Sequence, residues 1–597
     1  MLKKKAFSWL WLLLFFWPAL LSSELSQESL LVFVSPARLL PEKIFRVMLV
    51  SEEKLSGEIR VCWRDNQGKR QALKLHKKGG GPPFWQWWQG STESSGLYSL
   101  EVVEGHKALF SREVEVFSSP RKPEPPAVFW KTEKDWNRNE ENLFSSWLEA
   151  LFQEAEEKDS WSGLHPLLRD PEKNFLYDHL GLGEEESGLR LEPDCADNPF
   201  FLRAYFSWKN RLPFGFHECS RGSLGRPPAV GRWFSNELPS GEGDEVKKFY
   251  RLLQRVMDTV HSGTARTSLN DDLSDYYPLP LSRDCLRPGS VFADPYGHTL
   301  VIVRWVPQTE NSAGILLAVD AQPDGTIGIK RFWKGNFLFA TEEVVGEPGF
   351  KAFRPIVRKG GHLTLLTNQD IKNSPDYGNL SLEQKGLQPE LFYQKMETLI
   401  NPQPLDPENA LRQIYQALYE QLLVRVESVE IGEKYRREHP GQIIPMPSGY
   451  AVFLATGPWE DFSTPNRDLR LLIAMDTIEE FPENVIKFPK RYRIGTSEPL
   501  PKIKSRLEAL SRSLADSLYI NYRKSDGRSQ KLTIRELLER KEAFEMAYNP
   551  NDCVEIRWGA PEGSEELSSC RRRAPLDQRQ KMEKLRVWFR KRLHPPT

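Results

Sequence analysis

The spacing of apolar residues changes at a proline-rich segment spanning residues 120–126. Before it, apolar and polar side chains alternate, as at Ile59, Val61 and Trp63, which is typical of a strand with one buried face. After it, apolar residues recur at helical spacing over residues 143–155. Proline fixes φ and disfavours helix at the preceding residue, so the segment predicts an extended linker between two separately folding units.

This break divides a chain of 597 residues, which is long enough for several cores, into regions of different class. Residues 27–118 predict an all-β sandwich of immunoglobulin-like type, because short strands follow one another with turn signals between them. Residues 119–130 form the predicted linker. Residues 131–369 predict an α+β domain, and residues 370–597 predict a mixed α/β region that ends in a basic helix.

Helices precede strands in the predicted α+β domain. Apolar residues at helical spacing predict helices at 142–157, 199–209 and 245–260. Two strongly apolar runs predict strands at 299–305 and 314–320.

The overall charge excludes one class of function. The chain has 82 Lys and Arg and 82 Asp and Glu, so it lacks the global positive field of a protein that mainly holds nucleic-acid backbones. An apolar fraction of 39% excludes a disordered chain and a polytopic membrane protein.

A basic excess is found only locally: residues 570–597 contain ten Lys and Arg against two acids. This helix presents either a solvated face or a surface for anionic polymers or membrane head groups.

The first residues have the three parts of a secretory signal peptide. Lysines at positions 3–5 precede an apolar run over residues 8–21, and small polar residues follow. The run is shorter than the roughly 20 residues that span a bilayer, so we expect a signal peptide at residues 1–26 rather than an anchor. The mature protein is then exported to a bacterial periplasm or the exterior, and it is not an integral membrane protein.

Six cysteines in an oxidising compartment predict at least one disulfide. Cys553 and Cys570 flank a loop rich in Gly, Glu and Ser, and we expect this pair first. Cys219 with Cys285 is a second candidate pair. These pairings leave two cysteines over.

The 18 tryptophans include one cluster, Trp85, Trp87 and Trp88, next to a Gly/Pro-rich turn. Tryptophan serves both to fill cores and to stack on sugars. The cluster therefore either contacts a glycan or fills the interior of the predicted sandwich.

Cys195 is the candidate nucleophile. Polar residues and a proline precede the predicted helix at 199–209, so Cys195 lies at or just before its N-terminus. Free N–H groups and the positive end of the helix dipole favour a thiolate there. The alternative is a buried structural thiol or a disulfide partner. Cys219, close to His217 in sequence, is a rival nucleophile, but a Gly/Pro-rich loop follows it instead of a helix.

A base and an orienting group follow further along the chain. His298 opens an apolar strand directly after Gly297, and the next strand ends in Asp320. On adjacent strands Asp320 can accept a hydrogen bond from the imidazole and fix its tautomer, as in a Cys-His-Asp arrangement. The chain has no Cys-x-x-Cys or His-Glu-x-x-His spacing and no Gly-rich phosphate loop, so neither a metal nor a cofactor is predicted.

These motifs resemble the papain-fold cell-wall peptidases of the NlpC-like superfamily. In that family an Asp-Cys-small motif opens a helix, and a Pro-Gly turn and a strand lead to Gly-His. The matching residues here, within 130–360, are Asp194-Cys195-Ala196, Pro288-Gly289 and Gly297-His298. The resemblance implies a papain-like α+β core with Cys195 as nucleophile, His298 as base and Asp320 as orienting residue.

The resemblance also suggests residues that contact the substrate. Tyr177 corresponds to the family's substrate-contacting tyrosine, and Asp194 and Asp197 flank the nucleophile. The chain departs from the family pattern at Ala196-Asp197, where the family has Ser-Gly. Its separation from Cys195 to His298 is also longer than the family's usual span.

The function implied by the resemblance is that of an exported cysteine hydrolase acting on amide bonds of peptidoglycan or other envelope peptides through an acyl-enzyme. One alternative is an inactive envelope binding or scaffold protein on the same fold, which the departure at Ala196-Asp197 favours. Another is a transferase that passes the acyl group to an amine. No cofactor and no specific nucleic-acid partner is expected.

Overall fold

The structure is a computed structural model. The residues that it describes are 30–54, 58–65, 67–120, 126–158, 160–187, 190, 192–222, 226–295, 297–310, 312–322, 325–340, 346–453, 457–495 and 498–595. The expected signal peptide at 1–26 and residues 121–125 of the linker lie outside this part. Among the helices of the described residues, none is both long enough and apolar enough to span a membrane.

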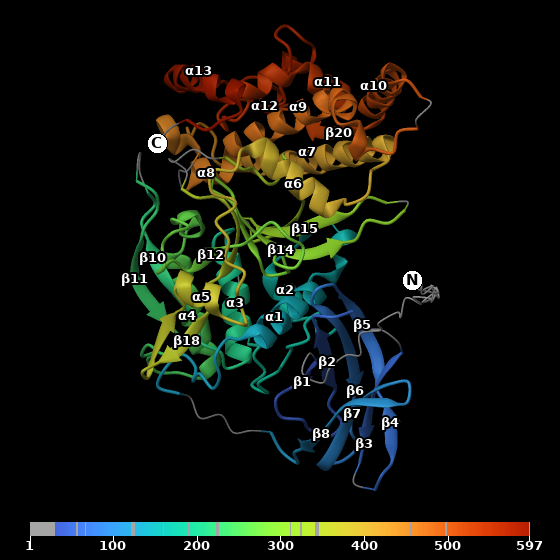
Figure 1. The fold of residues 1–597 in the computed structure, drawn as a ribbon. Helices are drawn as coiled ribbons and strands as arrows, with labels where there is room; N and C mark the ends of the chain where they lie inside the picture. Colours follow the sequence, from blue (N-terminus) through green and yellow to red (C-terminus); the bar gives the residue numbers. More distant parts are fainter. Residues whose placement is uncertain are drawn as a thin grey trace, which may run out of the picture.

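Eight N-terminal strands form two four-stranded antiparallel sheets (Figure 1). One sheet has the order β1 (Leu30–Ser35), β2 (Phe45–Ser51), β6 (Phe84–Gly90), β5 (Lys74–Gly80). The other has the order β4 (Arg70–Ala72), β3 (Ile59–Arg64), β7 (Gly96–Glu104), β8 (Lys107–Val116). Val47 and Leu49 of the first sheet share a buried core with Val61 and Leu100 of the second, so the sheets pack face to face as a sandwich.

The tryptophan cluster on β6 lies inside the molecule. Trp88 belongs to the core between the two sheets, whereas Trp85 and Trp87 belong to the core that contains α1 (Arg138–Leu151). All three side chains are at most 2% exposed, and Trp85 Nε1 donates to Glu149 of α1 at 2.9 Å. The prediction of a glycan contact is therefore wrong, because the rings join the sandwich to the next region.

A seven-stranded antiparallel sheet forms the centre of the molecule. Its order is β12 (Tyr276–Pro278), β17 (Gly349–Phe353), β13 (Val291–Ala293), β14 (Thr299–Val306), β15 (Ile315–Ala321), β16 (Ile327–Arg331), β9 (Ser160–Trp161). The predicted strands at 299–305 and 314–320 are β14 and β15. Alternation on β14 sends Val301 and Val303 to one face and Leu300 and Ile302 to the other, so both faces are buried.

Helices cover both faces of this sheet. α1 and α3 (Asp197–Lys209) pack on the first face, and α4 (Glu245–Thr259) packs against α3. α6 (Pro389–Ile400) shares the core of the second face, so residues after 370 also join this core. The predicted helices are confirmed, although α1 begins earlier than expected because the Asn137 side chain caps the backbone N–H of Glu140.

The C-terminal region is mainly helical. Its main elements are α7 (Pro407–Glu438), α9 (Pro465–Lys487), α10 (Leu500–Ser517), α13 (Leu576–Lys591) and the hairpin of β20 (Tyr519–Arg523) with β21 (Ser529–Thr533). Figure 1 shows these helices stacked on the central sheet, at the end of the molecule opposite the sandwich. A buried bidentate ion pair, Arg425 with Asp468, joins α7 to α9.

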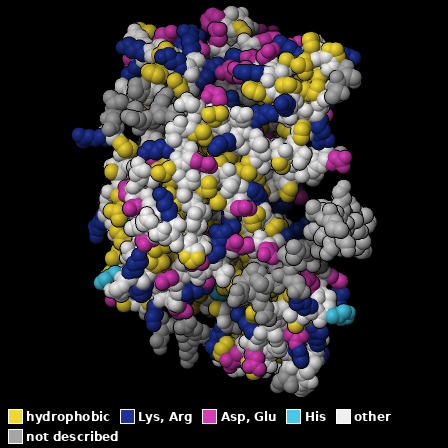
Figure 2. All heavy atoms as spheres, in the orientation of Figure 1, with side chains coloured by type: hydrophobic (Ala, Val, Ile, Leu, Met, Phe, Trp, Pro, Cys, Tyr) yellow, Lys and Arg dark blue, Asp and Glu magenta, His cyan; other side chains and the backbone are white. Residues whose placement is uncertain are grey.

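Shorter elements complete the fold. They are α2 (Leu164–Leu168), α5 (Asn368–Asn373), α8 (Pro458–Phe462), α11 (Ile534–Glu539), α12 (Val554–Arg557), and the pairs β10 (Gly215–Cys219) with β11 (Val230–Ser235) and β18 (Ile356–Lys359) with β19 (His362–Leu365). Arg586 and Arg590 of α13 both pair with Glu545, so carboxylates of the same chain neutralise part of the basic helix. Basic and acidic side chains are intermixed on the face drawn in Figure 2.

The cysteine pairings are partly as predicted. Cys553 and Cys570 form a disulfide, which confirms the first pair. Cys219 and Cys285 are both free, so the second pair is wrong. Cys62 and Cys195 are also free.

Candidate functional site

Cys195 lies in the turn that precedes α3, as its position before an amphipathic helix predicts. The side chain of Asp194 accepts from the backbone N–H of Ala196 at 2.8 Å and of Asp197 at 2.9 Å. The first donors of the helix are therefore occupied by a carboxylate and are not left for the thiol. Burial, followed by the charges of Asp194 and Asp320, raises the pKa of the Cys195 thiol well above its usual range. The expected lowering of this pKa is wrong.

A turn between β13 and β14 places His298 next to this thiol. The backbone N–H of Asp294 donates to the carbonyl of His298 at 2.9 Å, which closes the turn. Gly297 adopts φ of 104°, a conformation that favours glycine, and its carbonyl accepts the S–H of Cys195 at 3.6 Å. The same turn therefore sets the positions of both groups.

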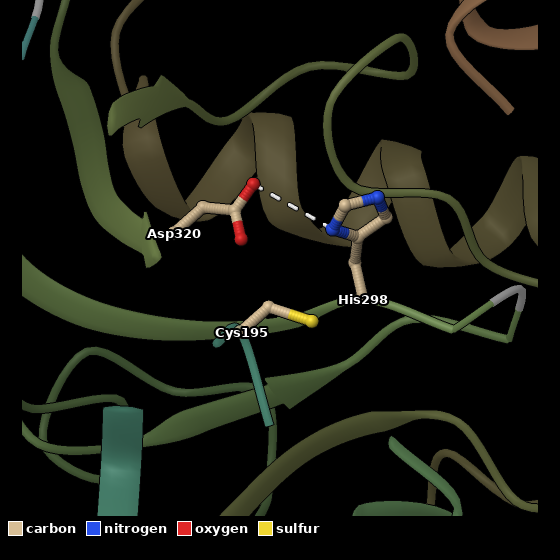
Figure 3. Close-up of side chains that lie close together, drawn as sticks. All are labelled: Cys195, His298 and Asp320. Atoms are coloured by element: carbon tan, nitrogen blue, oxygen red, sulfur yellow. Dashed lines mark ion pairs between the residues drawn. The ribbon is translucent and has the colours of Figure 1, made fainter. Parts of the chain in front are cut away.

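Asp320 completes a cluster at the ends of adjacent strands. Its Oδ2 lies 3.5 Å from Nδ1 of His298, and the ligand atoms of Cys195, His298 and Asp320 all lie within 4.8 Å of one another (Figure 3). Burial acts to raise the pKa of Asp320, but His298, with smaller contributions from Lys330 and Arg470, lowers it overall. Asp320 is therefore a buried carboxylate that stays ionised near neutral pH.

His298 and Asp320 face a cavity of about 60 Å³. Their side chains are 30% and 3% exposed, respectively, and Cys195 is partly exposed beside them. A larger cavity of about 570 Å³ shares several lining residues with the first, among them Lys330 and Arg467. Strands β15 and β16 form one wall of this space and helices α7 and α9 form the other.

The C-terminal region contributes directly to the site. Arg470 of α9 forms an ion pair with Asp294, in the turn before His298, at 2.8 Å. Arg467 of α9 donates to the side chain of Gln322, just after β15, at 3.2 Å. No sequence signal marked these residues, because the contacts join segments far apart in the chain. The charged residues of α9 could equally belong to a solvent-exposed helix, so their pattern did not predict a contact with His298 or Asp320.

The other predicted site residues have structural roles. Tyr177 lies against the sandwich, where its carbonyl accepts from Arg46 and its hydroxyl donates to Glu186. Asp194 caps α3, and Asp197 is 3% exposed. Burial, together with the charge of Asp194, raises the pKa of Asp197 to about 8. None of the predicted substrate contacts lines either of the two cavities beside His298.

Cys219, the rival nucleophile, is buried on β10. His217 does not face the thiol as a base. Its Nδ1 pairs with Asp275 at 2.6 Å, and the Cys219 S–H points to the His217 carbonyl at 3.9 Å. Burial, followed by the charge of Asp275, raises the pKa of Cys219 to about 12. This thiol is closed to substrate.

Besides Cys553, Glu555 and Cys570, whose two sulfurs are joined in the disulfide, two clusters among the described residues have donor atoms of the kind that hold metals. Cys195, His298 and Asp320 offer sulfur, nitrogen and oxygen, the donors that Zn²⁺ takes. The positive charges of Lys330 and Arg470, which act on Asp320, oppose a divalent cation there. The second cluster, Asp178, Glu184 and Glu185, surrounds the buried ammonium of Lys209, which pairs with both glutamates.

Comparisons of this chain with protein-family models, with curated proteins and with solved structures found no match.

Proposed function

We propose that the protein is an exported cysteine hydrolase, a peptidase or amidase that cleaves amide bonds in cell-wall peptides. One observation carries the proposal: the ligand atoms of Cys195, His298 and Asp320, which are distant in sequence, lie within 4.8 Å of one another, and His298 and Asp320 line a cavity. The order of their motifs resembles the NlpC-like superfamily. We accordingly interpret the central region as a papain-like core and the N-terminal sandwich as immunoglobulin-like.

The reaction begins with transfer of the Cys195 proton to the imidazole of His298. Because burial and neighbouring carboxylates raise the pKa of the thiol, the reactive thiolate forms only with the help of this base. Asp320 is ionised and its Oδ2 lies 3.5 Å from Nδ1 of His298, so its attraction grows when the imidazole becomes positive. Asp320 thus favours the proton transfer.

The thiolate attacks the carbonyl carbon of the amide, and the C–N bond breaks as His298 gives its proton to the leaving amine. The acyl group remains on Cys195 as a thioester. His298 then takes a proton from water, whose oxygen attacks the thioester. The carboxylic acid leaves, and the proton returns to sulfur.

Export is supported by the signal-like sequence at residues 1–26 and by the disulfide between Cys553 and Cys570. Disulfides persist in oxidising compartments such as the periplasm.

A second candidate is an envelope scaffold protein that binds cell-wall peptides without cleaving them. It is favoured by the raised pKa of Cys195 and by the use of the helix N-terminus to bind Asp194. A transferase on the same site would differ only in accepting an amine in place of water.

Digestion of purified peptidoglycan tests the proposal. We expect the wild-type protein to release new amines and carboxyl groups, and we expect Cys195→Ser to release none. Cys219→Ser is the matched control, because this buried thiol has no part in the reaction, and it should retain full activity. Binding without new amines would establish the scaffold. Amide exchange onto an added amine, with no net release, would establish the transferase.

A further inference from the structure

The larger cavity, of about 570 Å³, lies against the edge of the central sheet. Strand β9 is the outer neighbour of β16, and among the described residues it pairs with β16 only at Ile327 and Gly328. The lining of the cavity includes four consecutive residues of β16, 328–331. Successive side chains of a strand point to opposite faces, so consecutive residues line one cavity where the strand presents its edge. The edge of β16 beyond β9 therefore faces this space.

The backbone of β16 offers hydrogen-bonding groups along this edge. Just after the strand, the N–H of Phe332 donates to Leu316 of β15 at 2.9 Å. In an antiparallel ladder, residues that bond to one neighbour alternate with residues that face the other side. By this alternation Ile329 and Arg331 direct their backbone groups away from β15. A strand edge of this kind is a template for pairing with another extended segment.

The opposite wall of the cavity offers apolar contact. Leu423 and Ile431 of α7 both line the cavity and are 40% and 39% exposed. With Glu427 midway between them, they follow the i, i+4, i+8 spacing of one helix face. Phe462 of α8 lies in the same wall. A ligand that covers this stripe buries apolar surface, which favours binding.

Three carboxylates of this wall favour a cationic ligand. They are Glu427 of α7 and Glu460 and Asp461 of α8. Within the part of the chain that the structure describes, their side chains form no ion pair and no hydrogen bond. Neighbouring like charges repel one another, so a positive charge placed among them is attracted by all three.

The cations of the lining leave these carboxylates unpaired. Lys158 and Arg331 each form an ion pair with a different glutamate, Glu154 and Glu420, respectively. Lys330 also lines the smaller cavity beside His298, so it lies where the two cavities meet.

We propose that the larger cavity binds an extended peptide with basic side chains, which adds to the edge of β16 as a further strand and faces the carboxylates of α7 and α8. Main-chain hydrogen bonds to β16 supply affinity, and the carboxylates select the basic side chains. Cys195 does not line this cavity. The inference therefore concerns binding alone, and it does not depend on the proposed function.

The experiment uses the full chain carrying Cys195→Ser, so that the probes stay intact. The probes are acetyl-(Thr-Lys)₃-amide and acetyl-(Thr-Gln)₃-amide, titrated by calorimetry. We expect the lysine peptide to bind about tenfold more tightly, as charge-assisted hydrogen bonds imply. Adding Glu427→Gln together with Asp461→Asn should remove this preference.

Glu430→Gln is the matched control, because Glu430 also lies on α7 but pairs with Arg437 and does not line the cavity. It should leave the preference intact, and thermal unfolding should show that the variants are folded. Absence of binding, equal binding of the two peptides, or a preference that survives the double substitution would overturn the inference. A preference that Glu430→Gln also removes would overturn it too, since general surface charge would then explain the binding.

Methylated peptides test the added strand on the chain without these substitutions. Alternate residues of a strand direct their N–H groups to the same neighbour. N-methylation of the three lysines and N-methylation of the three threonines should therefore differ: one set should weaken binding about tenfold, and the other should leave it unchanged. Equal effects of the two sets would overturn strand addition to β16.

Discussion

Two neighbourhoods of this protein contain the same three residue types in different states. They are Cys195 with His298 and Asp320, and Cys219 with His217 and Asp275. In the second, Asp275 accepts from both Nδ1 and the backbone N–H of His217, at 2.6 and 2.9 Å. In the first, the distance from Nδ1 to Asp320 is 3.5 Å, and the imidazole is 30% exposed beside a cavity.

The difference shows that residue types alone do not make a reactive site. The pair of His217 with Asp275 is buried and is joined by two hydrogen bonds, which suits a role in stabilising the fold. Near His298, one oxygen of Asp320 has no hydrogen-bond partner among the described residues. An oxygen of Asp320 without a hydrogen-bond partner and access to a cavity therefore distinguish the candidate site from the buried pair of His217 with Asp275.

The largest contrast is expected from removal of the two histidines. His298→Gln should lower cleavage of peptidoglycan by about 10³-fold, within the range for loss of a general base, with little effect on stability. His217→Gln should leave the rate per folded molecule unchanged. The measurements are initial rates of amine release and thermal unfolding of both variants. Equal loss of rate in the two would contradict the division of roles.

The reverse contrast is expected for stability when the aspartate of the buried pair is changed. Asp275→Asn should lower the free energy of unfolding by about 2 kcal/mol, because it weakens two hydrogen bonds in a closed environment. Asp320→Asn should cost less, since its contact with Nδ1 is longer, while lowering the rate of cleavage. Urea unfolding followed by intrinsic fluorescence measures the difference. A larger loss of stability for Asp320→Asn would contradict the comparison.

The smallest effect concerns the dependence of stability on pH, and it belongs to the Cys195 side. The pKa of Asp197, the first residue of α3, is raised to about 8 by burial and by Asp194. The folded state then holds a proton that the unfolded state has lost between about pH 4 and 8. Stability contributed by this group is complete at low pH and is lost as the pH rises through this window.

Asp197→Asn should therefore gain stability relative to the wild-type protein as the pH rises from 5 to 8, by at most about 1.4 kcal/mol per pH unit. The measurement is the difference in unfolding free energy between the two proteins at several pH values. A flat difference for Asp197→Asn would show that Asp197 titrates normally.

Much of the architecture was predictable because it depends on local periodicity. Alternation at Ile59, Val61 and Trp63 marked strand β3, and apolar runs marked β14 and β15. The disulfide of Cys553 with Cys570 was predicted because the two residues flank a loop rich in Gly, Glu and Ser. Prediction failed where the environment of a residue depends on a distant element. The glycan contact predicted for Trp85 and Trp87 is wrong because α1 covers these side chains.

The candidate site was predicted in its members but not in its electrostatics. The positions of Cys195 before a helix and of His298 and Asp320 at strand ends were readable from the sequence, and the structure brings the three together. The raised pKa of the Cys195 thiol could not be predicted from the sequence. This pKa depends on burial and on the charge of Asp194, whose carboxylate occupies the N–H groups at the start of α3. Aspartate is common beside helix starts, so its presence in the sequence did not indicate a raised pKa for the neighbouring thiol.

The sequence by itself determined which segments become strands and helices, and it determined the order of Cys195, His298 and Asp320 along the chain. Backbone periodicity and turn chemistry act over a few residues, so they can be read from the sequence alone. Only the tertiary structure decided that α9 forms a cationic wall opposite β16 and that His298, unlike His217, faces a cavity. Charge, burial and access depend on all neighbours in space, and most of those neighbours come from distant parts of the chain.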